Sequence, residues 1–258
     1  MSRNEPGSSH TPVDGGVQSV ASALDVLDCF ATDPELGITE IARRIGVAKS
    51  TAHRLVTTLT SRGLLERSAD QRRYRLGMHT FALGQLALER NTIRSRALPT
   101  MQQLQRMTGA TVHLSVWEGA EVVYLERLLG RNCAELISVG RRLPSHCTSS
   151  GKVMAAYSPI FEHARTAAGF PRFTAASIHD TRGYLSALDR VRVQNYATNV
   201  EEAVEGYSSV AAPILDHRRT ARAAISIAAP SAVLAGSLGA TARLVQGAAK
   251  QLSAALCL

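Results

Sequence analysis

Residues 38–63 read ITEIARRIGVAKSTAHRLVTTLTSRG, and this stretch decides the fold of the N-terminal part of the chain. Thr39 is a predicted N-cap with Glu40 in the first helical turn, and the helix ends at Gly46, which tolerates a left-handed C-cap. A second helical run follows the short turn VAK and ends at Gly63. Two helices joined by a short turn that contains glycine form a helix-turn-helix.

The second helix has one apolar and one polar face. At about 100° per residue, four apolar side chains gather on the side that packs against neighbouring helices: Ala52, Leu55, Val56 and Leu59. The opposite side carries hydroxyl, imidazole and basic groups, which contact base edges and phosphates in a DNA major groove. The residues expected to contact DNA are Lys49, Ser50, Thr51, His53, Arg54 and Thr57. On this helix alone, the solvated face of a structural helix explains the pattern equally well.

The next segment, LLERSADQRRYRLG (64–77), predicts a basic β-hairpin. Leu65, Tyr74 and Leu76 are expected to face the core. The outward positions add three candidate phosphate contacts: Arg72, Arg73 and Arg75. A hairpin placed directly after the second helix is a wing that contacts the phosphate backbone or the minor groove.

Positive charge is concentrated in this region. The 258-residue chain has a net charge of +8, and residues 38–76 hold nine of its 29 Lys and Arg residues against three of its 21 Asp and Glu residues. A small basic module of this kind is typical of a nucleic-acid reader. Helix-turn-helix, wing and charge together favour DNA binding over a structural role.

The flanks of this module complete a predicted DNA-binding domain over residues 17–77. Residues 1–16 are polar and rich in Gly, Ser and Pro, and we expect a disordered arm there. A first amphipathic helix is predicted from apolar residues at helical spacing: Val17, Val20, Leu24, Leu27 and Phe30.

Residues 78–109 predict a helical linker that Gly84 and Pro99 should break or kink. Apolar residues recur along it at helical spacing: Met78, Phe81, Ala82, Leu86, Ile93, Ala97, Met101 and Leu104. This helix has more apolar surface than a single neighbouring element could cover, so it is expected to pack on a further partner. We expect dimerisation through this linker; docking on the chain's own second domain is the alternative.

Residues 110–258 predict a second domain of mixed α and β structure with an antiparallel sheet. Strands are expected in TVHLSVW (111–117), EVVYLERL (121–128), AELISVG (134–140), YSSVAAPILD (207–216) and ARAAISIAAP (221–230). Helices are expected at 150–157, 181–192 and 232–256. The fold class is therefore α+β.

Enzymatic and metal-binding signatures are missing from the sequence. TSSGKV (148–153) lacks the first Gly and the last Ser or Thr of a phosphate loop, and four widely spaced cysteines form no C-x-x-C pair. Cys147 beside His146 is a poor nucleophile–base pair, because a base approaches from a separate element. We expect no catalytic residues, no metal and no cofactor. The uncharged stretch 223–242 contains Pro and Gly, so we expect no membrane span and a cytoplasmic protein.

Small polar residues stand out in apolar segments of the second domain. Thr148 and Ser149 precede a predicted helix start, whose amides favour an anion. Ser209 opens a strand, and Ser226 lies among small aliphatic residues. Each serine alone is also explained as a core hydroxyl bonded to the backbone. A few hydroxyls in an aliphatic concavity suit a small organic acid better than a nucleotide.

The whole chain resembles the IclR-type (isocitrate-lyase-regulator) family of bacterial transcription factors. The resemblance rests on VQSVASALDVLDCF (17–30), the helix-turn-helix stretch (38–65), GRRLPSHCTSSGKVMAA (140–156), NYATNVEEAVEGYSSVAAPILD (195–216) and AAISIAAP (223–230). The blocks occur in the order of the family.

The resemblance implies a winged helix-turn-helix, a dimerising helical linker and a GAF-like effector-binding domain. It implies dimers or tetramers that bind operator DNA under the control of a small metabolite, often a carboxylic or aromatic acid. Transferred to this chain, the effector pocket contains Cys147, Thr148, Ser149, Asn199, Ser209 and Ser226. Two residues depart from the family pattern: Ala228 stands where some members have a second serine, and Asn199 where an acidic residue is common.

Two hypotheses follow. The first is a ligand-responsive, sequence-specific DNA-binding transcriptional regulator that works as a homodimer or homotetramer. The second is a small-molecule-binding enzyme or sensor whose N-terminal module mediates protein contacts. Affinity for duplex DNA and its dependence on salt separate the two, because phosphate contacts release counterions.

Overall fold

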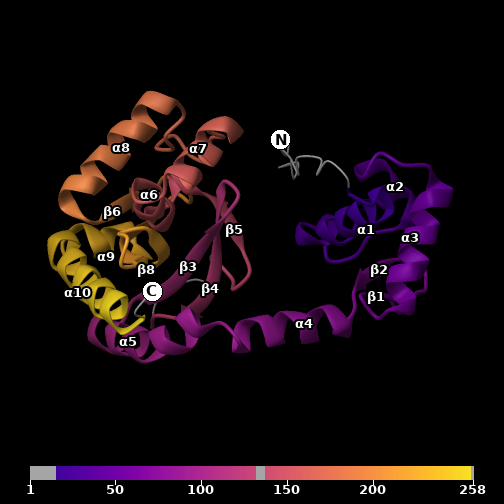
Figure 1. Cartoon of the computed structure of the whole chain (residues 1–258), viewed down its shortest axis with the longest axis horizontal. Helices are drawn as coiled ribbons and strands as arrows, with labels where there is room; N and C mark the ends of the chain where they lie inside the picture. The colour runs from indigo at the N-terminus through magenta and orange to yellow at the C-terminus, as the bar shows by residue number, and fades with distance from the viewer. Residues whose placement is uncertain (1–15, 132–136, 257–258) are drawn as a thin grey trace. The chain divides into compact units, whose positions relative to one another are not determined.

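The computed structural model describes residues 16–131 and 137–256 (Figure 1). Residues 1–15 of the expected disordered arm lie outside these ranges. The chain divides into two compact units between Arg90 and Asn91, inside the predicted linker. Each unit is built around its own hydrophobic core.

The first unit is a helix-turn-helix followed by a two-stranded antiparallel hairpin. Its elements are α1 (Gln18–Asp28), a 3-10 turn (Cys29–Ala31), α2 (Ile38–Arg44), α3 (Lys49–Ser61), β1 (Leu65–Arg67), β2 (Tyr74–Leu76) and α4 (Met78–Glu89). Leu36 forms an isolated bridge with Tyr74, which adds a third short segment to the hairpin. The core joins all of these elements except α4: Val26, Phe30, Leu36, Ile41, Val56, Leu59, Leu65 and Tyr74.

Two local expectations for this unit are wrong. Helix α2 begins at Ile38 with Gly37 as its N-cap, so Thr39 lies within the first turn. Leu76 is 43% exposed, because β2 is only three residues long and ends at the edge of the core. The glycines behave as expected: Gly46 and Gly63 adopt left-handed φ values of 67° and 71°.

Helix α1 is apolar on two sides, and the first unit buries only one of them. Val26 and Phe30 enter the core, with Leu27 packed against them. Val17, Val20 and Leu24 from the expected apolar stripe are 65%, 57% and 55% exposed.

The linker breaks at Asn91 and not at Gly84 or Pro99. Asn91 is the N-cap of α5 (Thr92–Thr108), and its side chain accepts a hydrogen bond from Arg94 N at 2.9 Å. Helix α5 runs through Pro99; Pro99 and Ser95, whose carbonyl loses its helical donor there, are both exposed residues. Helix α4 belongs to the first unit and α5 to the second.

The second unit is a six-stranded, fully antiparallel sheet in the order β5-β4-β3-β8-β7-β6. Its strands are β3 (Thr111–Glu118), β4 (Glu121–Leu128), β5 (Arg142–Pro144), β6 (Ala197–Val200), β7 (Tyr207–Leu215) and β8 (Ala221–Pro230). Its helices are α5, α6 (Ser149–Ala156), α7 (Pro159–Ala168), α8 (Thr181–Gln194), α9 (Ser231–Ala235) and α10 (Leu238–Leu256), with a 3-10 turn at Ser145–Cys147.

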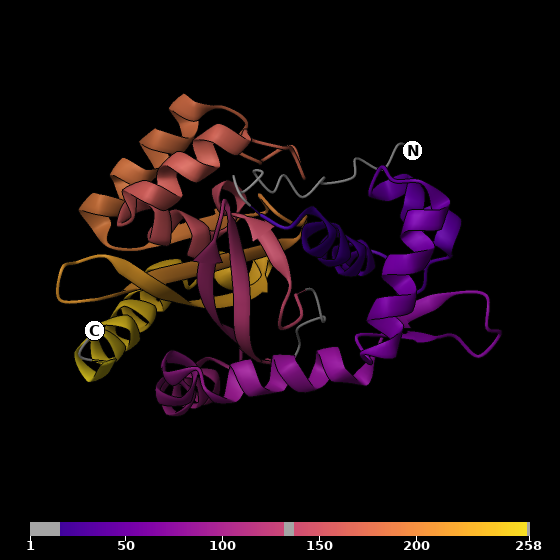
Figure 2. The ribbon, with the colours of Figure 1, turned by 45° about the vertical axis from the view of Figure 1, so that its right-hand side comes forward.

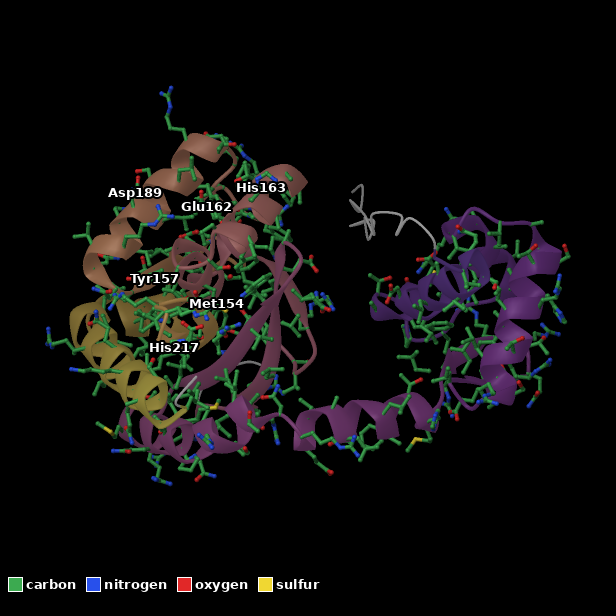
Figure 3. The ribbon with its side chains drawn as sticks, viewed as in Figure 1. Met154, Tyr157, Glu162, His163, Asp189 and His217 are labelled. Carbon is green, nitrogen blue, oxygen red and sulfur yellow. The ribbon has the colours of Figure 1, made fainter. Side chains whose placement is uncertain are left out.

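Helices cover both faces of this sheet (Figure 2). Helices α5 and α10 pack on one face, where Val112, Leu114, Ile225 and Ile227 point into a core with Met101. On the other face lie α6 and α8, with Met154, Phe161, Tyr184 and Leu188 in their core. Arg192 on α8 joins α7 to α8, because its guanidinium bonds Asp189 at 2.7 Å and Glu162 at 2.6 Å. Glu162 on α7 and Asp189 on α8 are labelled in Figure 3.

The expected α+β class with an antiparallel sheet is confirmed, and four of the five expected strands are present. The fifth, 134–140, lies partly outside the described residues, and its described part, 137–140, is not a strand. Strands β5 and β6 and helix α7 were not expected from the sequence, and the expected helix 232–256 divides at Gly236 into α9 and α10. No helix within residues 16–131 or 137–256 is long and apolar enough to cross a membrane.

Candidate functional site

Helix α3 presents its polar face to solvent, because its apolar face is fixed in the core by Ala52, Val56 and Leu59. All six predicted residues of this face are exposed: Lys49, Ser50, Thr51, His53, Arg54 and Thr57. Among the described residues, no carboxylate lies within ion-pair distance of Lys49 or Arg54. The two cations are therefore available to an anionic partner.

The wing arginines differ in their partners. Arg73 donates to the carbonyl of Glu35 at 3.1 Å and lies 3.8 Å from the Glu40 carboxylate. Arg75 forms a 2.7 Å ion pair with Glu66. Arg72 lies at the hairpin tip, where its backbone N–H donates to Asp70 Oδ1 at 3.0 Å. Two of the three predicted phosphate contacts are thus partly neutralised within the module.

In the second unit, polar side chains line up across the sheet because their strands pair in register. His113 on β3 lies opposite Arg127 on β4 and, on its other side, opposite Ser226 on β8. In the neighbouring row, Thr111 lies opposite Ala228, Ala228 opposite Ser209, and Ser209 opposite Asn199. Cross-strand partners point to the same face. Both rows therefore lie on the face covered by α6.

A pocket of about 50 Å³ lies over these rows. Besides the row residues, its lining comprises Tyr124, Leu129, Ile137, Leu143, Thr148, Ser149, Ala203, Val204, Tyr207 and Ser208. These come from β4, the segment between β4 and β5, β5 itself, the start of α6, the β6–β7 loop and the start of β7. The site combines hydroxyls, one amide, one imidazole and one guanidinium with aliphatic walls, as small-molecule pockets do.

The start of α6 is held tightly against the preceding turn. A Cβ at Gly151 would lie 2.3 Å from the Cα of Ser145, so only glycine fits there. Thr148 caps the helix, and its Oγ1 accepts a hydrogen bond from Gly151 N at 3.0 Å. This close packing places Ser149 in the pocket, where its hydroxyl lies 2.7 Å from that of Ser209.

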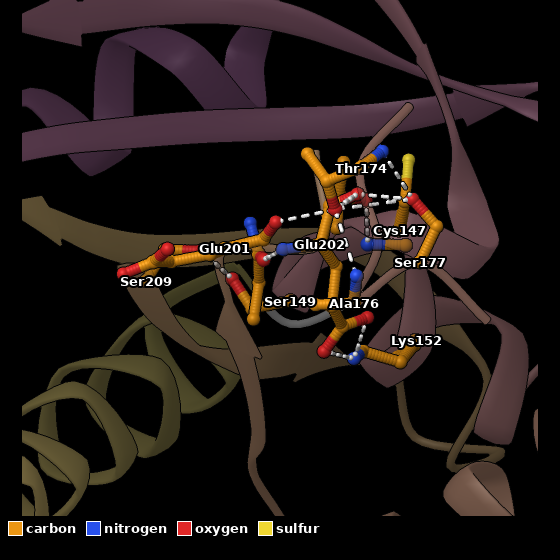
Figure 4. Close-up of polar contacts among 12 residues, drawn as sticks. Cys147, Ser149, Lys152, Thr174, Ala176, Ser177, Glu201, Glu202 and Ser209 are labelled. Atoms are coloured by element: carbon orange, nitrogen blue, oxygen red, sulfur yellow. Dashed lines mark hydrogen bonds and ion pairs between the residues drawn. The ribbon is translucent and has the colours of Figure 1, made fainter. Parts of the chain in front are cut away.

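The β6–β7 loop is fixed from several sides (Figure 4). Lys152 on α6 bonds both carboxylate oxygens of Glu202 at 2.6 Å, and both side chains are buried. Asn199 Oδ1 accepts from Glu202 N at 2.8 Å, and Ser177 donates to the Glu202 carbonyl at 2.6 Å. The pocket wall formed by this loop is thereby tied to the helix that carries Ser149.

Burial determines the protonation states of His113 and Tyr124 on the pocket floor. The pKa of His113 is lowered to about 4, first by burial and then by the charge of Arg127, so the imidazole is neutral at pH 7. Its ring contacts Tyr124 edge-on at a centroid distance of 5.2 Å. Burial also raises the pKa of Tyr124, which keeps its phenol protonated.

Five of the six predicted effector residues line the pocket: Thr148, Ser149, Asn199, Ser209 and Ser226. Cys147 is not among the lining residues. Its side chain is fully buried, and its thiol donates to the carbonyl of Pro144 at 3.3 Å. Burial raises the pKa of this thiol to about 12, which leaves it unreactive.

Four floor residues on the β3–β4 side were missed: Thr111, His113, Tyr124 and Arg127. A signal for the first two was present in the sequence. In TVHLSV (111–116), polar residues alternate with Val112 and Leu114, which is typical of a strand with one polar face. Within the described residues no group of three or more His, Cys, Asp or Glu side chains could hold a metal ion.

Each of the two parts of the chain matches a known protein family. Residues 19–69 match the family described as "IclR helix-turn-helix domain", and residues 85–254 match "Bacterial transcriptional regulator IclR C-terminal". The two matches together span most of the chain.

Curated relatives carry regulator names. The chain is 37% identical over 215 residues to the HTH-type transcriptional regulator XynR of Escherichia coli, covering 82% of this chain and 85% of that protein. It is 33% identical over 213 residues to the glycerol operon regulatory protein of Streptomyces coelicolor, covering 82% and 84%. These relatives are regulators and not enzymes, which confirms that expectation.

Solved structures of IclR-type regulators are similar to this chain over most of its length. An IclR transcriptional regulator from Alicyclobacillus acidocaldarius superposes with a TM-score of 0.81 at 27% identity, covering 93% of this chain and 98% of that one. An IclR homologue from Microbacterium hydrocarbonoxydans, complexed with 4-hydroxybenzoate, has a TM-score of 0.77 at 28% identity, with 92% and 98% covered. The paired helices, the wing, the polar pocket and these matches together place the chain in the IclR family of bacterial transcriptional regulators.

Proposed function

We propose that this chain is a transcriptional regulator that binds operator DNA through α3 and the wing and whose DNA affinity responds to a small organic acid in the second unit. The exposed face of α3 carries the proposal. Its cations Lys49 and Arg54 have no carboxylate within ion-pair distance among the described residues, while the opposite face is buried. An exposed cationic helix beside a wing suits the major groove.

The DNA contacts divide into two classes. Ser50, Arg54 and Thr57 are proposed to read base edges, with Thr51 and His53 on the flanks of the same face. Lys49, Arg72, Arg73 and Arg75 are proposed to bind phosphates. A regulator that works on DNA in this way resides in the cytoplasm.

The effector is proposed to bind in the pocket over the β-sheet. Thr148, Ser149, Asn199, Ser209 and Ser226 offer it hydrogen bonds inside a partly aliphatic wall. The complex of a homologue with 4-hydroxybenzoate supports an acid as the ligand class. Asn199 in place of an acidic residue makes the floor less anionic, and Ala228 in place of a serine removes one hydroxyl from it.

We further propose that the working form is a homodimer or homotetramer. Helix α4 buries none of its residues and exposes four large apolar side chains: Met78, Phe81, Leu83 and Leu86. Exposed apolar groups in this number mark an interface. Phe81→Glu should shift the sedimentation coefficient of the full chain toward the monomer, whereas Glu89→Ala on the same helix should leave it unchanged.

The DNA proposal is tested by measuring the affinity of the full chain for a duplex that the chain selects from a random pool, over a salt series. Several phosphate contacts predict that log K falls linearly with log salt. Binding without salt dependence, or no binding, would favour the protein-contact module of the second hypothesis.

A further inference from the structure

The second unit has another hollow, which lies apart from the proposed effector pocket. It is a groove of about 710 Å³, a size within the range of small-molecule sites, whereas the effector pocket measures about 50 Å³. No residue lines both. The groove is formed by the end of β7 with the turn that follows it, by Asn195 at the end of α8, and by one face of α10, which contributes residues 246, 249, 250 and 253.

The floor of the groove is apolar, and its strand edge has no free N–H. The apolar lining residues are Ala212, Pro213, Leu215 and Ala249. Strand β6 pairs with β7 only as far as Ala211, so no strand covers this side of β7 beyond that point. Pro213 has no N–H, and the N–H of Leu215 donates to Ser253 Oγ at 2.9 Å. Since alternate residues of a strand point their N–H groups to the same side, an extended peptide would find no donor here. A compact molecule is the better occupant.

The rim of the groove carries positive charge that the chain leaves unbalanced. Arg219 in the turn and Lys250 on α10 are both exposed, and within residues 16–131 and 137–256 no carboxylate lies within ion-pair distance of either. Asp216 is the only acid among the lining residues, and its side chain is 1% exposed. Its carboxylate accepts two backbone N–H groups of the turn, at 2.9 and 2.8 Å, and pairs with Arg222 at 2.8 Å. Asp216 is therefore already neutralised.

A neutral partner holds the guanidinium of Arg219 in place. It hydrogen-bonds the hydroxyl of Tyr157, the residue that ends α6, and this hydroxyl donates to Asn195 Oδ1 at 2.6 Å. Figure 3 labels Tyr157 and, on the same turn as Arg219, His217. The tyrosine positions the cation without balancing its charge, and a guanidinium has five N–H donors, more than one hydroxyl uses.

From this groove we propose that the second unit has a second ligand site, which binds a small organic phosphate with its phosphate between Arg219 and Lys250 and its organic part on the apolar floor. A phosphate monoester carries a charge of about −1.5 to −2 at pH 7, which two cations balance. A guanidinium fork and an ammonium point charge are both suited to phosphate oxygens. The site adds a second ligand to the function proposed above and does not depend on the effector pocket.

The first test measures the binding of phenyl phosphate to the full chain by calorimetry at low salt. This probe joins a phosphate to a flat apolar ring. Phenol lacks the anion and inorganic phosphate lacks the apolar part, so each should bind at least about tenfold more weakly, because burial of a ring and a charge-assisted contact are each worth about 1.5 kcal/mol or more. No binding of phenyl phosphate at millimolar concentration, or equal binding of inorganic phosphate, would overturn the proposal.

Variants test whether the probe lies in the groove. Lys250→Met and Arg219→Gln each remove one cation from an exposed position, and each should weaken phenyl phosphate about 10- to 100-fold. Arg243→Met removes a cation from an exposed position of α10 outside the groove and should bind like the unmodified chain. Unchanged affinity in both Lys250→Met and Arg219→Gln, or an equal loss in Arg243→Met, would overturn the assignment. An unchanged Tm of each variant without the probe shows that it folds.

Two other occupants of a cationic groove give different results. If the groove contacted DNA, Lys250→Met would lower the affinity for the selected duplex and flatten its salt slope. If a second copy of the chain covered the groove, Lys250→Met would shift the sedimentation coefficient. The proposal predicts that both quantities stay as in the unmodified chain while phenyl phosphate binding falls. A change in either quantity without any loss of phenyl phosphate binding would contradict it.

Discussion

Lys152 on α6 donates hydrogen bonds to both carboxylate oxygens of Glu202, each at 2.6 Å, and the side chains are only 5% and 12% exposed. This pair joins the helix that begins with Ser149 to the loop that contributes Ala203 and Val204 to the pocket wall. A ligand that displaces the Ser149–Ser209 hydrogen bond therefore acts on two elements that are already linked.

Removing one partner of this buried pair should be strongly destabilising. Lys152→Met leaves the Glu202 carboxylate buried without its cation, and we expect a loss of about 3–5 kcal/mol in the free energy of unfolding by urea titration. The double variant Lys152→Met/Glu202→Leu should recover much of this loss. The matched control is Arg192→Met, which removes a 41%-exposed partner of Glu162 and should cost less than about 1 kcal/mol. A loss in Lys152→Met no larger than in the control would contradict this role.

Stability should fall on mild acidification because of two buried histidines. The pKa values of His113 and His146 are each lowered to about 4 in the folded chain, mainly by burial. The unfolded chain, with pKa near 6.5, binds protons first as pH falls. The stabilisation is therefore complete above pH 6.5 and is lost as pH falls toward 4.

At pH 5 the loss amounts to about 2 kcal/mol for each histidine, from about 1.4 kcal/mol per pH unit. Urea unfolding of His113→Gln at pH 7.5 and pH 5.0 should show a smaller difference than the unmodified chain. His163→Gln, at an exposed site on α7, serves as the control. Identical pH dependence in all three proteins would refute the assignment to His113.

Arg54 is expected to determine operator preference. If its guanidinium makes a bidentate base contact, Arg54→Ala should cost about 1–3 kcal/mol on the selected operator and much less on random DNA. Competition gel shifts give the ratio of the two affinities. Arg62→Ala, exposed just beyond the end of α3, controls for loss of charge alone. An unchanged ratio in Arg54→Ala would mean that another surface reads the bases.

Glu66 should restrain the wing. Its carboxylate is paired with Arg75 at 2.7 Å, so Glu66→Gln should free this cation for phosphate. We expect tighter binding to specific and random DNA alike, with the log–log salt slope steeper by about 1. Anisotropy titrations at several salt concentrations measure both. An unaltered slope would show that Arg75 does not meet the backbone.

Regular patterns could be predicted from the sequence, and irregular segments could not. The helix-turn-helix, β3, β4, β7 and β8 follow from periods of 3.6 and 2 residues and from Gly46 and Gly63 at helix ends. Strand β6 is four residues long and β5 three, too short for a period to appear. Helix α1 has apolar side chains on two sides, so periodicity alone could not tell which side the core takes.

The pocket was predicted on one side only. The resemblance pointed to six residues on or near α6, β6, β7 and β8, and five of these six residues line the pocket. Cys147 was misplaced because the 3-10 turn at Ser145–Cys147 breaks helical spacing and turns its thiol toward Pro144. Arg127 and His113 come together through strand register, which depends on the pairing of β3 with β4 and is invisible in either segment alone.

The most direct test of the account is the Kd of the full chain for its selected duplex, by fluorescence anisotropy at fixed salt, with and without an acid that stabilises the chain. Regulation by the ligand predicts a change of at least about fivefold with the acid and none with its amide, corresponding to a coupling free energy of about 1 kcal/mol. Equal Kd values with and without the acid, at saturating concentration, would contradict it.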